Sequence, residues 1–352
     1  MDKDFFVNFI EVTLALVGAL TLIKKLPCIR ISYNHLIFIS MLVFIAFIAA
    51  FNTNGEYLFG VVKLAMCCFL IYFSYHFSRY SPMILVFFLI ACSIQSFFVT
   101  GHLDKFSFLP VSFISLILVS VYSKGDNLKG LLVLCILIDV LQSVYTSYRG
   151  QILFCILAFF CIFLKFSIKR RMTLVFVAVP LSYLSVMYLL GLYFFSYREP
   201  ILSATSSNIE RSSMIYWGVN KFYDFLVSAP TVTFFQENAG QYKAVYLMNP
   251  AIPNDPHSFL IMLFVFFGFI PTVMIFLFLI RMVSKTTQRI SFIPGRRADF
   301  VSLAFLQAII IFSMHPFNSF SRVFFSLTFG VFLAFGSGKY FNEVQCDDKQ
   351  KD

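Results

Sequence analysis

The stretch "MTLVFVAVPLSYLSVMYLLGLYFFS", residues 172–196, carries no charged side chain from end to end. About 20 apolar residues in a helix are enough to cross the hydrocarbon core of a membrane. Hydrocarbon offers the backbone no hydrogen-bond partners, and alternating barrel strands would not read as a continuous apolar block. This stretch therefore predicts a helix in a membrane protein.

The composition of the whole chain extends this prediction. Of 352 residues, 59% are hydrophobic, 19% are aromatic and only 12% are charged, which is far outside the usual balance of a soluble domain. We expect an all-α polytopic membrane protein, a single membrane domain over residues 1–352 with about eleven transmembrane helices. The predicted spans are 5–23, 35–52, 57–75, 82–99, 107–122, 129–146, 150–168, 172–196, 257–280, 298–314 and 319–336.

Basic residues predict the orientation of these spans, because short loops rich in Lys and Arg stay in the cytoplasm. Clusters such as "KKLPCIR" at 24–30, "IKRR" at 168–171 and "RMVSKTTQRISFIPGRR" at 281–297 fall in alternate loops. We therefore expect an external N-terminus, a basic cytoplasmic loop over 281–297 and a cytoplasmic tail over 337–352. The net charge of +10 is explained by these clusters facing anionic membrane lipid, and nothing else in the chain indicates a nucleic-acid partner.

The longest connection is the external loop 197–256, between the eighth and ninth predicted spans. Long loops in compact proteins usually carry function. Within this loop, "SNIERSSMIYWGVNKFYDFLVSAP" at 207–230 has helical periodicity, and Ser207 and Glu210 form a capping-box pattern. We expect an amphipathic helix across the mouth of the bundle, with its apolar face on the membrane or on the helices beneath.

A single histidine follows this loop. Asp255 suits the N-cap of the next helix and Pro256 its first position, which predicts His257 in the opening turn of a long helix over 257–280. The partial positive charge of a helix N-terminus disfavours imidazolium, so a neutral imidazole there can accept a proton as a general base. The alternative is a histidine that merely stands at a helix end.

Two arginines lie on the same predicted side of the membrane. Arg149 stands in the external connection between the sixth and seventh spans, and Arg211 lies in the loop helix. A guanidinium group binds phosphate through a bidentate fork and stays protonated. Both are therefore candidate phosphate ligands, although Arg149 could instead contact lipid headgroups and Arg211 could face solvent.

Three ionisable residues lie inside predicted spans, at a similar depth from the external ends. They are Glu11, Lys63 and Asp139. Such groups seldom face lipid and usually pair or line a cavity. Two interpretations remain open, a structural ion pair between Lys63 and Asp139 or a polar floor beneath an external cavity. The cysteines show no metal-type spacing and no aspartate-rich external motif occurs, so we expect neither a metal site nor a cofactor.

Three short motifs resemble those of the O-antigen polymerase and O-antigen ligase superfamily. "HSFLIMLFVFFG" at 257–268 is similar to that family's "HNxYLxxLxExG" pattern, "YRGQILF" at 148–154 to its "SRG" segment, and "ERSSMIYW" at 210–217 to its loop arginine followed by tryptophan. The layout also resembles that family, with many spans and a late, large periplasmic loop.

The chain departs from the motifs at Ser258, Phe266 and Tyr148, where the family has Asn, Glu and Ser. These departures put the contacts at Ser258 in doubt more than the class.

The resemblance implies a membrane-embedded, GT-C-like glycosyltransferase of lipopolysaccharide biosynthesis, independent of metal, in the bacterial inner membrane with its site facing the periplasm. By matching position, His257 would be the base, and Arg149 and Arg211 would bind the diphosphate. Undecaprenyl-diphosphate-linked oligosaccharide would be donor and acceptor, and a chain-length regulator protein could be a further partner. We expect a polymerase first; the alternatives are an O-antigen ligase that uses lipid A core as acceptor and a lipid-linked oligosaccharide flippase.

Overall fold

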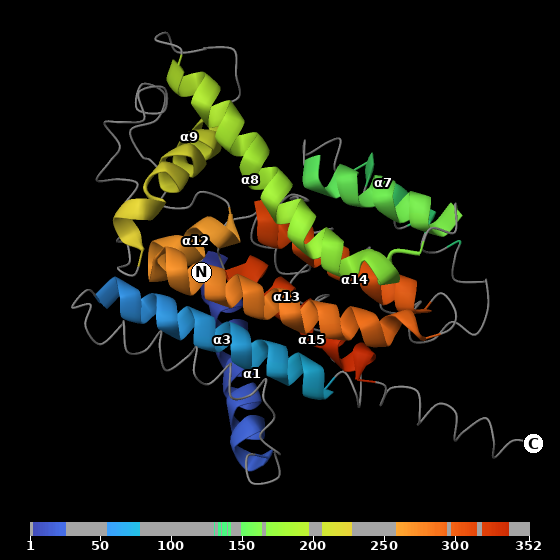
Figure 1. The fold of residues 1–352 in the computed structure, drawn as a ribbon. Coiled ribbons are helices and arrows are strands. Elements are labelled where there is room, and N and C mark those ends of the chain that lie inside the picture. Colours follow the sequence, from blue (N-terminus) through green and yellow to red (C-terminus); the bar gives the residue numbers. More distant parts are fainter. Residues whose placement is uncertain are drawn as a thin grey trace, which may run out of the picture.

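A computed structural model describes residues 3–25, 55–77, 149–163, 167–196, 206–226, 258–293, 297–314 and 319–337, with some positions between 130 and 141 (Figure 1). Every regular element in these ranges is a helix, which confirms the all-α prediction for this part of the chain. The α-helices are α1 Lys3–Lys25, α3 Gly55–Phe77, α7 Arg149–Phe163, α8 Met172–Ser196, α9 Ser206–Asn220, α12 Phe259–Phe267, α13 Phe269–Ser291, α14 Arg297–Met314 and α15 Ser319–Gly336. The 3₁₀ helices are η2 Lys169–Arg171 and η3 Phe222–Phe225.

Three helical stretches are long and apolar enough to cross a membrane, namely Gly60–Phe77, Lys169–Tyr193 and Phe269–Ser291. By length and composition, these helices are compatible with a membrane protein. The predicted spans 172–196 and 319–336 coincide with α8 and α15. The spans 35–52, 82–99 and 107–122 lie outside the described residues, so the total of eleven stays a prediction.

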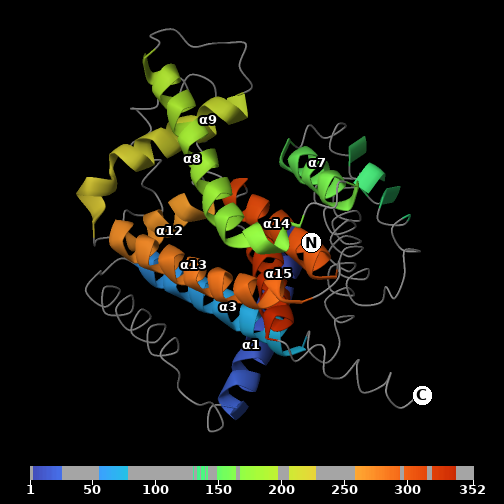
Figure 2. The same ribbon diagram turned by 45° about the vertical axis from the view of Figure 1, so that its right-hand side comes forward.

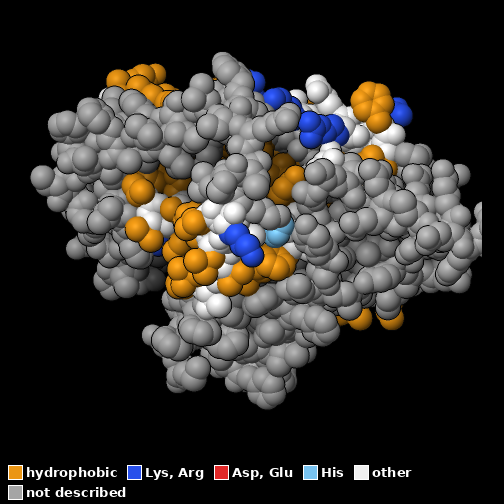
Figure 3. All heavy atoms as spheres, turned by 90° about the horizontal axis from the view of Figure 1, so that it is seen from below, with side chains coloured by type: hydrophobic (Ala, Val, Ile, Leu, Met, Phe, Trp, Pro, Cys, Tyr) orange, Lys and Arg blue, Asp and Glu red, His pale blue; other side chains and the backbone are white. Residues whose placement is uncertain are grey.

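The surface of the described helices fits a lipid environment. Large apolar side chains are exposed along α1 and α8, including Leu20 at 66% and Leu174 at 67% of their full accessible area. Seen from below, hydrophobic side chains surround a small basic group (Figure 3). In water such exposure would be unfavourable, whereas hydrocarbon accepts it without cost.

Helix α3 packs closely against α1, α15 and α12, and a glycine stands at each of these contacts. A Cβ on Gly330 would lie 2.5 Å from the carbonyl oxygen of Ile71, and one on Gly60 would lie 2.8 Å from the side chain of Phe266. Gly18 similarly faces the carbonyl oxygen of Phe69. Small residues let membrane helices approach closely enough for their backbones to pack.

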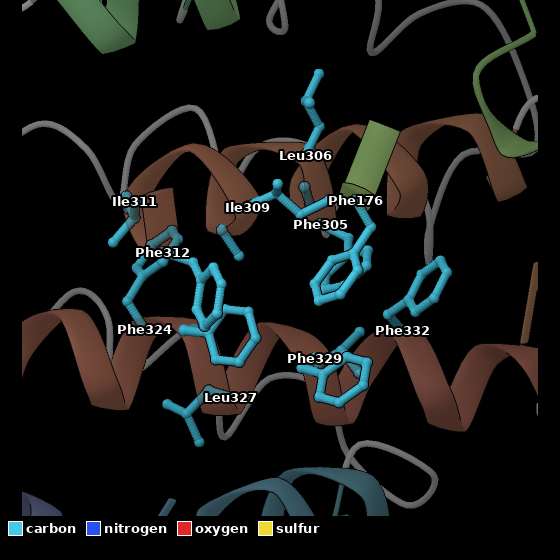
Figure 4. Packing of buried hydrophobic residues seen from close by; sticks show 14 of the residues in the cluster. Phe176, Phe305, Leu306, Ile309, Ile311, Phe312, Phe324, Leu327, Phe329 and Phe332 are labelled. Atoms are coloured by element: carbon cyan, nitrogen blue, oxygen red, sulfur yellow. The ribbon is translucent and has the colours of Figure 1, made fainter. Parts of the chain in front are cut away.

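A cluster of phenylalanine rings joins α8, α14 and α15 (Figure 4). The ring centroid of Phe305 lies 4.3 Å from that of Phe332 and 6.1 Å from that of Phe176. Phe312 continues the cluster toward α12, with its ring 4.5 Å from that of Phe259. The stacked rings fix the bundle on which the candidate site is built.

The predicted single helix over 257–280 is wrong, because the chain breaks at Gly268. Gly268 has φ 81°, a left-handed conformation that favours glycine, and separates α12 from α13. Figures 1 and 2 both show α12 and α13 meeting there and running in different directions. The nine residues of α12 span about 13 Å, too short to cross a membrane, and all nine side chains are buried.

Helix α13 extends further than predicted at its other end. The segment 281–297 was expected to be a loop, yet it is helical as far as Ser291. The buried residues Val283, Thr286 and Ile290 recur at helical spacing, so packing of this face maintains the helix beyond the apolar run.

Candidate functional site

The loop helix forms as predicted, but it is shorter. The expected helix over 207–230 is α9, which ends at Asn220 and is followed by η3. In both ribbon views α9 lies beside α8 (Figures 1 and 2). At the crossing, a Cβ on Gly191 of α8 would lie 2.5 Å from Cβ of Tyr216 and would also meet the carbonyl oxygen of Ser212. The sequence left two surfaces open for the apolar face of this helix, the membrane and the helices beneath. The described contacts of α9 are with the helices.

A second buried apolar cluster contains residues of both α9 and α12. Met214 and Ile215 of α9 pack with Ile261, Phe264 and Val265 of α12, and Tyr183 of α8 completes the cluster. The loop helix and α12 therefore contribute side chains to one buried cluster.

The 3₁₀ helix η3 strengthens this attachment. The ring of Phe222 lies 4.7 Å from that of Phe264 and 5.0 Å from that of Phe269. The backbone N–H of Ile270 donates to the carbonyl oxygen of Leu226 at 2.9 Å. The segment 206–226 is thus fixed to both sides of the break at Gly268.

Arg211 lies on this fixed segment, one turn before Ile215. Its side chain is partly buried, and its Nε atom is buried without a hydrogen-bond partner in the described part of the chain. A guanidinium N–H that is removed from water without an acceptor costs free energy, which an anionic ligand would offset. The position therefore suits a residue that receives a negatively charged group.

An aromatic and polar edge lies between α8 and α9. The hydroxyl of Tyr188 donates to Oδ1 of Asn220 at 3.3 Å, and its ring lies 5.2 Å from that of Tyr216. Lys221 Nζ lies 5.2 Å from the ring centroid of Trp217 and pairs with Asp224 at 2.7 Å. The rings of Tyr188 and Tyr216 beside Asn220 are chemically suited to a sugar, whereas Lys221 is engaged with Trp217 and Asp224 at the surface.

His257 itself lies outside the described residues, but the structure describes the start of the helix that follows it. Ser258 is the N-cap of α12, with extended backbone and a buried side chain, and its carbonyl accepts from the N–H of Met262. The helix begins at Phe259, so the prediction that His257 lies in its opening turn was wrong. The N-cap is Ser258 and not the predicted Asp255, and Ser258 makes no side-chain cap hydrogen bond, so the buried apolar run Phe259–Phe267 sets the start of the helix.

Arg149 is the first residue of α7, and its side chain lies outside the described part. Helix α7 packs on α14. A common site for Arg149, Arg211 and His257 stays a prediction.

Of the three ionisable residues predicted inside spans, Glu11 has a partner that the sequence did not indicate. Glu11 forms a bidentate ion pair with Arg322 of α15, with Nε donating to Oε1 at 2.7 Å and Nη2 to Oε2 at 2.8 Å. Both side chains are buried, at 1% and 6% exposure. Lys63 Nζ lies 5.2 Å from the ring centroid of Phe266. Asp139 is outside the described residues, so the pair between Lys63 and Asp139 is untested.

Arg322 was missed at the sequence level. Its signal was available, since an arginine inside the predicted span 319–336 needs a partner at that depth. Its partner could not be identified, because Glu11 is 311 positions away in the chain.

The buried pair leads to a stability prediction. Glu11→Gln would leave the Arg322 charge buried without its carboxylate, so we expect a loss of about 3–5 kcal/mol of stability. Thermal unfolding of the purified protein in detergent measures it. The double variant Glu11→Gln/Arg322→Gln should recover part of the loss, and Lys221→Gln, which breaks an exposed pair, should change stability little. Unchanged stability of Glu11→Gln would show that the pair contributes nothing.

Within the described ranges, no group of three His, Cys, Asp or Glu side chains could hold a metal ion. Comparison of the chain with protein-family models, with curated proteins and with solved structures finds no match. Function is therefore argued from the residues, the motifs and their arrangement.

Proposed function

We propose that the chain is an O-antigen polymerase of the bacterial inner membrane, with its site facing the periplasm. It transfers a glycan chain from undecaprenyl diphosphate onto the non-reducing end of a new lipid-linked repeat unit. The observation that carries the proposal is the buried cluster shared by α9, which holds Arg211, and α12, which begins two residues after His257. Most of two of the three motif matches, residues 211–217 and 258–268, thereby belongs to helices that share this cluster.

The chemistry requires a base and a stabiliser for the leaving group. The bond between the anomeric carbon and the diphosphate oxygen breaks, and a glycosidic bond forms to the acceptor hydroxyl. His257 takes the hydroxyl proton, while Arg211 and Arg149 neutralise the negative charge that develops on the lipid diphosphate. The buried, unsatisfied Nε of Arg211 supports its share of this role.

The surroundings suit a lipid-linked substrate. Exposed apolar side chains on α8, such as Leu189 at 61%, would face the polyprenyl tail's hydrocarbon environment. The edge formed by Tyr188, Tyr216 and Asn220 offers stacking faces and hydrogen-bonding groups to the sugar.

Deletion of the gene in its native bacterium, followed by electrophoresis of lipopolysaccharide, tests the proposal against its alternatives. A polymerase deletion leaves a core that carries one repeat unit. Complete loss of O-antigen from the core would indicate a ligase or a flippase and would overturn the proposal.

A further inference from the structure

The ring of Phe222 lies at the break between α12 and α13. Phe264 belongs to α12 and Phe269 to α13, so these two rings stand on opposite sides of Gly268 in the chain. The planes of Phe222 and Phe264 meet at 67°, edge to face, whereas the planes of Phe222 and Phe269 are inclined by 28°, as in a stack. Aromatic pairs favour both arrangements. One side chain of η3 therefore joins the two helices across the break.

The backbone at the end of η3 also contacts the start of α13. The first N–H groups of a helix have no acceptor within that helix. The N–H of Ile270 finds an acceptor in the carbonyl oxygen of Leu226, directly after η3, at 2.9 Å. The segment is thus held at Phe222 by ring contacts and at Leu226 by a backbone hydrogen bond.

η3 is continuous with the helix that carries Arg211. The N–H of Lys221 donates to the carbonyl oxygen of Trp217 in α9 at 3.1 Å, and the N–H of Asp224 donates to that of Lys221 at 3.1 Å. α9 itself packs closely on α8 at Gly191. Backbone hydrogen bonds therefore connect the helix that bears the guanidinium group to the segment that contacts α12 and α13.

We propose that Phe222 is a positioning residue for glycosyl transfer, an inference that rests on the proposed function. Its ring fixes where α12 begins relative to Arg211. Phe264 lies about 9 Å along α12 from Ser258, which is joined to His257 by a peptide bond. Because α12 is one short, buried helix, a displacement at Phe264 is transmitted to the base.

The ring contacts constrain α12 in a way that its apolar cluster with α9 does not. Met214 and Ile215 share that cluster with Ile261 and Val265, and contacts between aliphatic side chains have no preferred direction. An edge-to-face ring pair has a preferred angle, so it resists sliding and rotation of α12. A general base must lie within hydrogen-bond reach of its proton, and a displacement of about 1 Å can cost about 10²-fold in rate. Loss of the ring should therefore slow transfer more than it weakens substrate binding.

Elongation kinetics of the purified full-length protein test this role. Phe222→Leu keeps an apolar side chain but removes the ring, so we expect kcat to fall about tenfold while KM for the lipid-linked repeat unit stays nearly constant. Phe222→Tyr keeps the ring and should retain most of kcat. Tyr223→Leu removes the neighbouring ring of η3, which is 85% exposed, and should leave both constants near those of the wild type. A wild-type kcat for Phe222→Leu, or an equal loss for Tyr223→Leu, would overturn the inference.

Hydrogen–deuterium exchange tests the placement of α12 without any activity. The N–H of Met262 donates to the carbonyl oxygen of Ser258 at 3.0 Å, so its exchange reports on the first turn of α12. It should exchange faster in Phe222→Leu than in the wild type or in Tyr223→Leu, whereas peptides of α8 should not change. Unchanged exchange at Met262 would overturn the inference, and so would a loss of protection throughout the chain, α8 included. A wild type that does not elongate would instead contradict the proposed function, and the exchange result would still decide whether Phe222 holds α12.

Discussion

Arg211→Lys should slow elongation about 10²-fold, the scale on which one stabiliser of a developing negative charge acts. Lysine keeps the positive charge, but an ammonium group does not reproduce the planar fork that holds two phosphate oxygens. The effect should be large because α9 is packed against α8 and shares a buried cluster with α12, so the backbone at Arg211 cannot shift to compensate. Elongation of lipid-linked repeat units by the purified variant gives the measurement.

Lys221→Gln is the matched control for this experiment. Lys221 lies on the same segment, directly after α9, but it is engaged with Trp217 and Asp224 at the surface. Its elongation rate should stay near that of the wild type. If Arg211→Lys folds normally and elongates as fast as Lys221→Gln, then Arg211 does not bind the diphosphate.

His257→Ala should have an even larger effect, with a loss of about 10²- to 10⁴-fold, because it removes the general base. Chains should collapse toward single repeat units in cells that express the variant. Folding should persist, since the helix that follows starts at Phe259 and is held by its own buried side chains.

Ser258→Ala is the neighbouring control. Ser258 is the N-cap of α12, but its side chain makes no cap hydrogen bond, so the substitution should cost much less activity. Normal chain lengths in cells with well-expressed His257→Ala would mean that His257 is only a residue next to a helix end.

The sequence correctly predicted the ends of two helices that are long apolar runs. Residues 172–196 match α8 because an uncharged apolar run has no stable conformation in hydrocarbon other than a helix. Residues 319–336 match α15, whose single charge, Arg322, is paired with Glu11. The break at Gly268 could not be predicted in this way. Glycine is tolerated inside membrane helices, and only the packing of α12 and η3 selects its left-handed conformation.

In the candidate site too, nearby residues predicted the helix, whereas its tertiary contacts could not be predicted. Helix α9 was predictable from local periodicity, although it begins at Ser206 and not after the predicted cap Ser207. Its packing against Gly191 and its cluster with Ile261 depend on distant parts of the chain. From the depth of Glu11 in its span, the sequence predicted that its carboxylate would pair or line a cavity. Depth alone cannot name that partner, and the bond to Arg322 follows from the packing of α1 against α15.

Incubation of the purified protein with undecaprenyl-diphosphate-linked repeat unit, in excess EDTA and without any other enzyme, examines the proposed activity itself. We predict a ladder of longer lipid-linked chains, because the candidate residues stabilise the leaving group through guanidinium and not through a metal ion. Repeat units that stay single both in EDTA and after Mg²⁺ is restored, while the same preparation transfers them to lipid A core, would contradict the polymerase assignment.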